Sequence, residues 1–227
     1  MQTTSPETWL PQRLVKVATS LGELCREPVE FSIEPRATEE AVQQIEMEIG
    51  RNIPRQLYQF FLNVSAQFEF DWYFDRDFVQ RLPDRLQNVR GGYVDFSLSS
   101  LDAFWTNWSA DWEQRFTVEQ RSPNSKIKYE FHNLFPIHQD GGGNSLVLVI
   151  DGPNEGAVLI QGFEDLGMAN ARLASSFDSF LDIWSKLGFA GPDPLALRPF
   201  YDEKADSLLL DLPTSKEWRS LCGIESV

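Results

Sequence analysis

The chain has 227 residues and a formal net charge of −14, because 34 Asp and Glu outnumber 20 Lys and Arg. This balance argues against nucleic acid as a direct ligand, since phosphate binding needs clustered Lys and Arg, and it suits a basic protein partner or simple solubility. No apolar run approaches the roughly 20 residues that span a bilayer, so we expect no membrane partner.

The N-terminal residues 1–7 lack the basic start and apolar core of a secretion signal, so the cytoplasm is the expected location. The two cysteines, Cys25 and Cys222, have neither CxxC nor metal-site spacing. We interpret them as isolated small hydrophobic residues rather than as a functional disulfide. The length allows one domain with additions, or two small domains.

The first part of the chain predicts helices separated by a short extended segment. Apolar residues recur at helix spacing over 6–26, and 29–33 is predicted to be extended because a proline follows it closely. Thr38 is a suitable N-cap for a helix that Gly50 would end. Pro54 suits the first turn of the next helix.

The middle of the chain predicts strands. Residues 68–74 begin with alternating aromatic and acidic side chains, which favours a half-exposed strand. The charged segment 75–89 is predicted to be a loop or a short helix. The pair Gly91-Gly92 predicts a turn, and 93–98 alternates like a strand.

A tryptophan-rich helix should begin after Ser99 or Ser100, which are both suitable caps. Its residues Trp105, Trp108 and Trp112 fall on one face, at i, i+3 and i+7. We favour core packing for these side chains over a platform for a sugar or peptide.

The most regular part of the chain is a predicted hairpin. The apolar run 146–150 is bounded by turn formers, which predicts a buried strand. A turn at 151–156 and a second strand at 157–163 should follow, with a hairpin as the simplest connection. An amphipathic helix is predicted over about 176–187.

Three segments in this order resemble the SUKH superfamily (the Smi–Knr family). They are 33–61, with Ile49-Gly50 and Ile53-Pro54 inside it; 135–144, with Phe135-Pro136-Ile137 and Asp140-Gly141-Gly142-Gly143-Asn144; and 174–181. The family often has Asn-Gly after its second helix, whereas this chain has Asn63-Val64 there.

The resemblance covers about 33–189 and implies an α+β fold, with a mainly antiparallel β-sheet and helices packed around it. It divides the chain into an N-terminal helical extension at 1–32, a SUKH-like domain at 33–190, and a C-terminal appendage at 191–227 docked on the core. The resemblance also implies a binding role, because many bacterial members look like immunity proteins that neutralise toxins and others act as regulatory modules. Fold alone does not fix function.

Residues that could suggest chemistry have simpler interpretations. The run 141–143 precedes an apolar strand and lacks the Lys-Ser/Thr pair of a phosphate loop, so we predict a turn. His132 and His138 have no nearby cysteine and no HExxH spacing, and no Gly-x-Ser-x-Gly elbow is present. Paired carboxylates near the hairpin are expected by chance in so acidic a chain; they are Asp140, Asp151, Glu164 and Asp165. We therefore predict no enzyme, metal site or cofactor.

One segment combines acids with aromatic residues, as a protein interface with a buried anchor and a charged rim would. A solvated strand end is the competing interpretation. The predicted partner-binding residues are Asp71, Trp72, Asp75 and Asp77, with Asp102 and Glu113 beside them. If Trp72 belongs to the core instead, its truncation should destabilise the fold.

Taken together, these observations predict a protein-binding module, an immunity protein that neutralises a basic toxin by occluding it. The alternative is a regulatory or scaffold module without a toxin, and a small-molecule-binding or enzymatic role comes third. The sequence sets neither the partner nor the oligomeric state.

Overall fold

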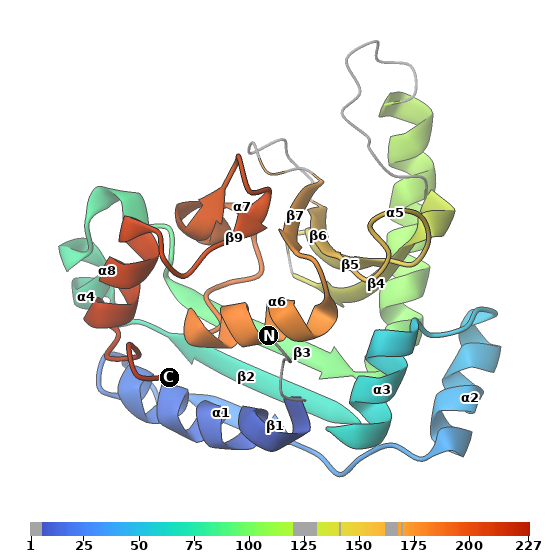
Figure 1. Cartoon of the computed structure of the whole chain (residues 1–227), viewed down its shortest axis with the longest axis horizontal. Coiled ribbons are helices and arrows are strands. Elements are labelled where there is room, and N and C mark those ends of the chain that lie inside the picture. The colour runs from blue at the N-terminus through green and yellow to red at the C-terminus, as the bar shows by residue number, and fades with distance from the viewer. Residues whose placement is uncertain (1–5, 120–130, 141, 162–167, 169) are drawn as a thin grey trace.

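The computed structural model describes residues 6–119, 131–140, 142–161, 168 and 170–227, with the backbone alone for 111–119. In chain order the elements are α1 (Pro6–Gly22), β1 (Glu30–Ile33), α2 (Glu39–Ile49), α3 (Arg55–Asn63), β2 (Gln67–Tyr73), α4 (Arg76–Arg81), β3 (Gly91–Ser97), α5 (Leu101–Glu119), β4 (Leu134–Gln139), β5 (Ser145–Val149), β6 (Val158–Gln161), β7 (Ala171–Ala174), α6 (Phe177–Lys186), α7 (Pro194–Leu197), β8 (Tyr201–Asp202), β9 (Ser207–Leu208) and α8 (Pro213–Leu221). The predicted α+β class is confirmed, with antiparallel sheets and helices around them (Figure 1). Within these described residues, no helix has the length and hydropathy of a membrane span.

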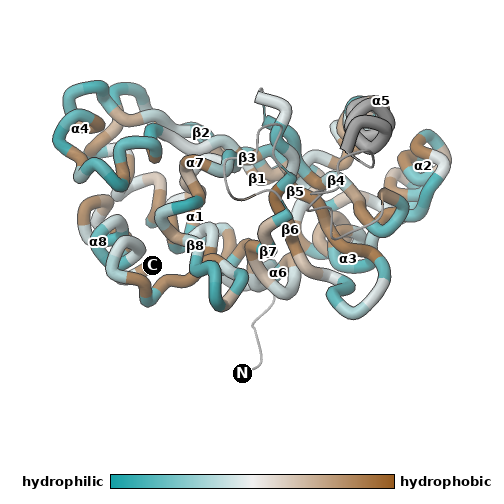
Figure 2. The backbone as a smooth tube through the Cα atoms, turned by 90° about the horizontal axis from the view of Figure 1, so that it is seen from above, coloured by the Kyte–Doolittle hydropathy of each residue, from teal (hydrophilic) through white to brown (hydrophobic). Residues whose placement is uncertain are grey.

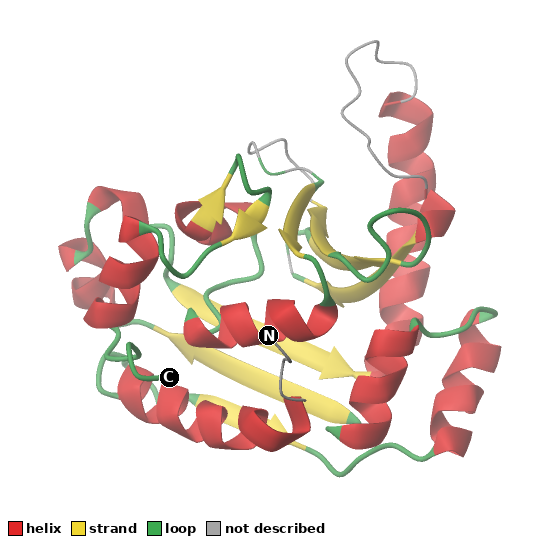
Figure 3. Ribbon diagram, viewed as in Figure 1, coloured by secondary structure: helices red, strands yellow, loops and turns green. Residues whose placement is uncertain are grey.

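The first sheet has the strand order β1-β2-β3 (Figure 3). Its strands place two kinds of side chain on opposite faces. In β2 the residues Phe68, Phe70 and Trp72 are buried, and the residues between them are more exposed. This alternation follows from the period of two along a strand. The helices α1 and α6 lie on the same side of this sheet when it is seen from above (Figure 2).

The second sheet has the order β4-β5-β6-β7. Every residue of β5 and β6 is buried, which confirms the predicted hairpin. Neither β4 nor β7 was predicted. Pro136 lies inside β4, where the sequence argues against a strand, but β4 is an edge strand, and an edge tolerates proline. The four residues of β7 are too few to give a periodic signal.

Helix ends agree with the capping residues of the sequence. Thr38 Oγ1 accepts a hydrogen bond from Ala41 N at 3.2 Å, and Gly50 ends α2 with a φ of 65°. At α6, Ser176 Oγ accepts a hydrogen bond from Ser179 N at 3.1 Å. These side chains satisfy amide groups that have no partner inside the helix.

The prediction of a turn at Gly91-Gly92 was wrong, because both glycines lie in β3. A Cβ atom on Gly92 would lie 2.0 Å from the carbonyl oxygen of Phe189 and 2.5 Å from Trp72 Nε1. The glycine is therefore required by close packing of the backbone and not by a turn.

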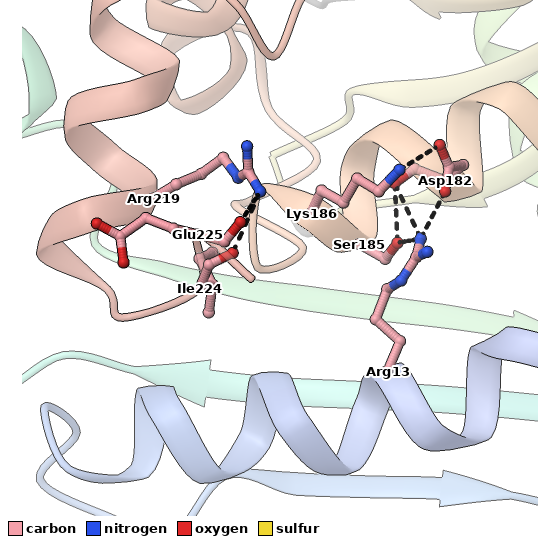
Figure 4. A network of polar contacts seen from close by, with 7 residues as sticks. All are labelled: Arg13, Asp182, Ser185, Lys186, Arg219, Ile224 and Glu225. Atoms are coloured by element: carbon pink, nitrogen blue, oxygen red, sulfur yellow. Dashed lines mark hydrogen bonds and ion pairs between the residues drawn. The ribbon is translucent and has the colours of Figure 1, made fainter. Parts of the chain in front are cut away.

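The N-terminal helix is joined to the core by a polar network (Figure 4). Arg13 Nη1 donates to Asp182 Oδ1 at 2.6 Å and to Ser185 Oγ at 2.9 Å. Lys186 Nζ donates to the other oxygen of Asp182 at 2.8 Å. The network fixes α1 against α6, and the apolar face of α1 lies in the same hydrophobic core as the first sheet.

The C-terminal segment also enters this core. Trp218 of α8 is fully buried, and its Nε1 donates to the Leu187 carbonyl oxygen at 2.9 Å. Its ring lies 6.3 Å from that of Trp72, centroid to centroid. Arg219 Nη2 donates to the Glu225 carbonyl oxygen at 2.6 Å and closes the end of the chain onto α8 (Figure 4).

Candidate functional site

The outer face of the first sheet gathers acidic side chains from three strands. Glu30 of β1 is opposite Asp71 of β2, and Glu69 of β2 is opposite Asp95 of β3. Residues that are opposite in an antiparallel pair share a face and have neighbouring Cβ atoms. We call the surface formed by Glu30, Glu69, Asp71 and Asp95 the acidic face.

The charges of the acidic face are not neutralised within the described part of the chain. No Lys or Arg there forms an ion pair with any of the four carboxylates. Oδ1 of Asp71 and Oδ1 of Asp95 are buried and have no hydrogen-bond partner among the described residues. Such an arrangement costs stability.

The pKa values of two of these carboxyl groups are raised by burial and by a neighbouring carboxylate. Burial raises the pKa of Asp71, and the nearby carboxylate of Glu30 raises it further. Burial likewise raises the pKa of Asp95, with Glu69 adding to the effect. The causes agree with the strand register, which places the carboxylates of each pair opposite one another.

Two tyrosines complete the surface. Tyr73 is 61% exposed and Tyr93 is 39% exposed. Tyr93 stands opposite Asp71, and Tyr73 stands opposite Gly91 at the end of β2. Burial first and acidic neighbours second raise the pKa of both phenols, so both remain neutral donors at pH 7. Exposed tyrosines beside acids supply the aromatic contact that interfaces use.

The predicted partner-binding residues divide between the surface and the core. Asp71 lies on the acidic face. Trp72 is only 2% exposed, and its Nε1 donates to the Gly188 carbonyl oxygen at 2.8 Å. It therefore belongs to the core, the second of the two possibilities that the sequence left open. The sequence already indicated this position, because Trp72 follows Phe68 and Phe70 at every second residue and so lies on the same side of the strand.

The other predicted acids lie outside the acidic face as defined here. Asp75 caps α4, and its Oδ1 accepts a hydrogen bond from Asp77 N at 2.7 Å. Asp102 is exposed in the first turn of α5. Glu113 lies further along α5, where side chains are outside the described residues, as is that of Trp112.

The residues predicted from the sequence did not include Glu30, Glu69, Asp95 or Tyr93. The alternation of β2 could have identified Glu69, because Glu69 is two residues from Asp71 and therefore lies on the same face of the strand. The other three residues depend on the register of β1 and β3 against β2, which no single stretch of sequence specifies.

The residues considered for chemistry do not form a catalytic set among those that the structure describes. His138 is fully buried, with Nδ1 3.2 Å from the Asp95 carbonyl oxygen, and burial lowers its pKa to about 4. Asp140 Oδ1 accepts hydrogen bonds from Gly142 N and Asn144 N, each at 2.8 Å, so it holds the predicted glycine turn. Asp151 accepts a hydrogen bond from the next amide, whereas 164–165 lie outside the described residues. No metal-ligand cluster occurs in the described chain.

Trp105 and Trp108 of α5 face the second sheet. The Trp105 ring lies 5.8 Å from that of Phe135, and the Trp108 ring stacks on Phe131 at 4.7 Å, centroid to centroid. Trp108 is buried. For these two residues the structure supports core packing over a ligand platform.

Comparison with protein families gives a match over much of the chain. The model of the SMI1/KNR4 family (SUKH-1) matches residues 36–183. A search of the curated proteins gives no match. The matched range includes β2 and β3, which carry three of the four carboxylates of the acidic face.

Proposed function

The chain belongs to the SMI1/KNR4 family (SUKH-1), and from that premise we propose that it is a non-enzymatic protein-binding module that protects a cell from a toxin. The family includes immunity-type proteins. The proposed partner is a basic toxin domain, which the protein would neutralise by covering the basic groups that bind the toxin's substrate.

The acidic face carries this proposal. Four carboxylates lie on one sheet face without a basic partner among the described residues. A basic surface would supply the missing counter-charges on binding, and the exposed rings of Tyr73 and Tyr93 would add contact area. A concentrated negative field also accelerates encounter with a positive partner.

The proposal places this action in the cytoplasm. Cys25 and Cys222 are free thiols, which suits a reducing compartment. Occlusion needs no catalytic residue, and the buried, neutral His138 is consistent with a binding role.

The test begins with toxins encoded beside the gene. Each toxin is co-expressed with this chain, growth is scored, and any protected pair is purified for association kinetics. We expect rescue by one toxin partner and a one-to-one complex. A partner that is bound without rescue would instead favour a regulatory or scaffold module. Neither rescue nor binding with any of these toxins would reject the immunity function.

Two triple variants locate the interface, and each removes three charges. The first neutralises three of the four carboxylates of the acidic face, and the second neutralises three of the four acids that the sequence selected outside it; they are Glu30→Gln/Glu69→Gln/Asp71→Asn and Asp75→Asn/Asp77→Asn/Asp102→Asn. The first should slow association about tenfold at low salt and flatten its salt dependence. The second should have a smaller effect, and the reverse order would move the interface to α4 and α5.

A further inference from the structure

A hollow of about 610 Å³ lies at the end of the first sheet, next to α4. Its lining residues are Arg26, Tyr73, Phe74, Arg76, Val79, Gln80, Gln87 and Arg90. Three arginines are thus brought together from three separate segments of the chain.

Backbone contacts fix this convergence. A β-bridge pairs Cys25 with Phe74 and so brings Arg26 beside the end of β2. Phe74 N donates to the Arg90 carbonyl oxygen at 3.0 Å, which holds Arg90 at the same place. Arg76 follows as the first residue of α4.

The hollow is basic although the chain is strongly acidic. Among the residues that the structure describes, no carboxylate lines it, and none of Arg26, Arg76 and Arg90 forms an ion pair. The nearby carboxylate of Asp75 is used by the amide of Asp77 at the start of α4. Other arginines of the chain do have carboxylate partners, as Arg13 does in Asp182.

The lining indicates the chemistry of a ligand. A guanidinium group can donate two parallel hydrogen bonds to the oxygens of a phosphate. Three guanidinium groups carry more positive charge than a single carboxylate would neutralise. The exposed ring of Tyr73 can stack on a planar group, while the amide of Gln80 can hydrogen-bond its edge. The volume lies within the range of small-molecule sites.

We propose that this hollow binds a small ligand in which a phosphate or diphosphate is joined to a planar ring, as in a nucleoside diphosphate. Such a ligand needs one local cluster of arginines, whereas a nucleic acid polymer needs an extended basic surface. The three arginines are separate from the carboxylates of the acidic face, and Tyr73 lies at the border of both. The proposal does not depend on the toxin proposal.

The test is isothermal titration calorimetry of the full-length protein with ADP, pyrophosphate and adenosine. We expect ADP to bind more tightly than either fragment. Arg76→Gln and Arg90→Gln should each weaken ADP binding by about tenfold or more, because each removes a charge-assisted contact. Tyr73→Ala should weaken ADP binding and leave pyrophosphate binding unchanged.

Arg55→Gln is the matched control. Arg55 is also exposed, but it belongs to α3, at the opposite end of the molecule from α4 (Figure 1). Circular dichroism checks that each variant is folded. Absence of ADP binding at millimolar concentration would overturn the proposal, as would an equal loss with Arg55→Gln. A Tyr73→Ala variant that binds ADP normally would overturn the assignment of a planar group.

Discussion

Replacing Asp95 by asparagine should stabilise the folded protein at pH 7. Asp95 lies opposite Glu69, its Oδ1 is buried without a partner, and its pKa is raised by burial and by Glu69. Asparagine keeps the shape of the side chain and an oxygen for the 3.4 Å contact with Ser100 Oγ. Like charges directly opposite on neighbouring strands cost up to about 1 kcal/mol, so we expect the free energy of unfolding to rise by about 0.5–1 kcal/mol.

The pH dependence of the free energy of unfolding provides a second test of the sign of this effect. A carboxyl whose folded-state pKa lies above its unfolded value binds a proton more readily in the folded chain. The penalty is therefore present at pH 7, and it is lost as the pH falls through the raised pKa of Asp95 toward the ordinary value of 3.8. The advantage of Asp95→Asn over the wild type should shrink across that window.

Urea unfolding followed by tryptophan fluorescence measures both quantities. Asp211→Asn serves as the control, because Asp211 is an exposed acid outside the first sheet. We expect that variant to change the free energy of unfolding by less than about 0.5 kcal/mol. If Asp95→Asn destabilises the protein, or matches the control at every pH, repulsion between the carboxylates of the acidic face does not destabilise the folded protein.

Three further predictions concern the core. Trp72→Ala should lower the free energy of unfolding by roughly 3–5 kcal/mol in urea, whereas near-normal stability would place Trp72 at the surface. His138 has a pKa of about 4 in the folded state against an ordinary 6.5. The free energy of unfolding should therefore fall by roughly 3 kcal/mol as the pH falls from 6.5 to 4, because the unfolded chain takes up the proton first. In urea unfolding at a series of pH values, His138→Gln should lack this part of the pH dependence. Arg13→Ala leaves the partly buried Asp182 with one fewer partner and should cost about 1–3 kcal/mol in a thermal melt. The exposed ion pair of Arg36 with Glu7 is its control, since Arg36→Ala should cost less than about 1 kcal/mol.

Local signals in the sequence were sufficient for the elements whose ends and faces are set by near neighbours. Thr38 and Gly50 mark the ends of α2 because a cap needs only the next few residues. The alternation of β2 likewise gives its two faces. Applied consistently, that alternation places Trp72 in the core and separates it from Asp71.

Long-range contacts account for what the sequence could not show. Gly92 is a strand residue because it pairs with Trp72 of β2, and it must be glycine because Phe189, far along the chain, packs against its backbone. Strand β4 exists because β5 supplies its hydrogen bonds, although Pro136 argues against a strand locally. The acidic face depends on two strand registers at once, so its members Glu30 and Asp95 could not be grouped before the sheet was known.

The packing of the chain ends bears on why the acids remain unpaired. The helix α1 and Trp218 of α8 enter the core that includes Phe70 and Trp72, on the inner side of the first sheet. The acids of the outer face therefore cost stability without supporting the core. If they serve only solubility, Asp95→Asn will stabilise the protein and leave association with a partner unchanged. If they serve binding, the same variant must gain stability and lose association rate together, because a single uncompensated charge causes both effects.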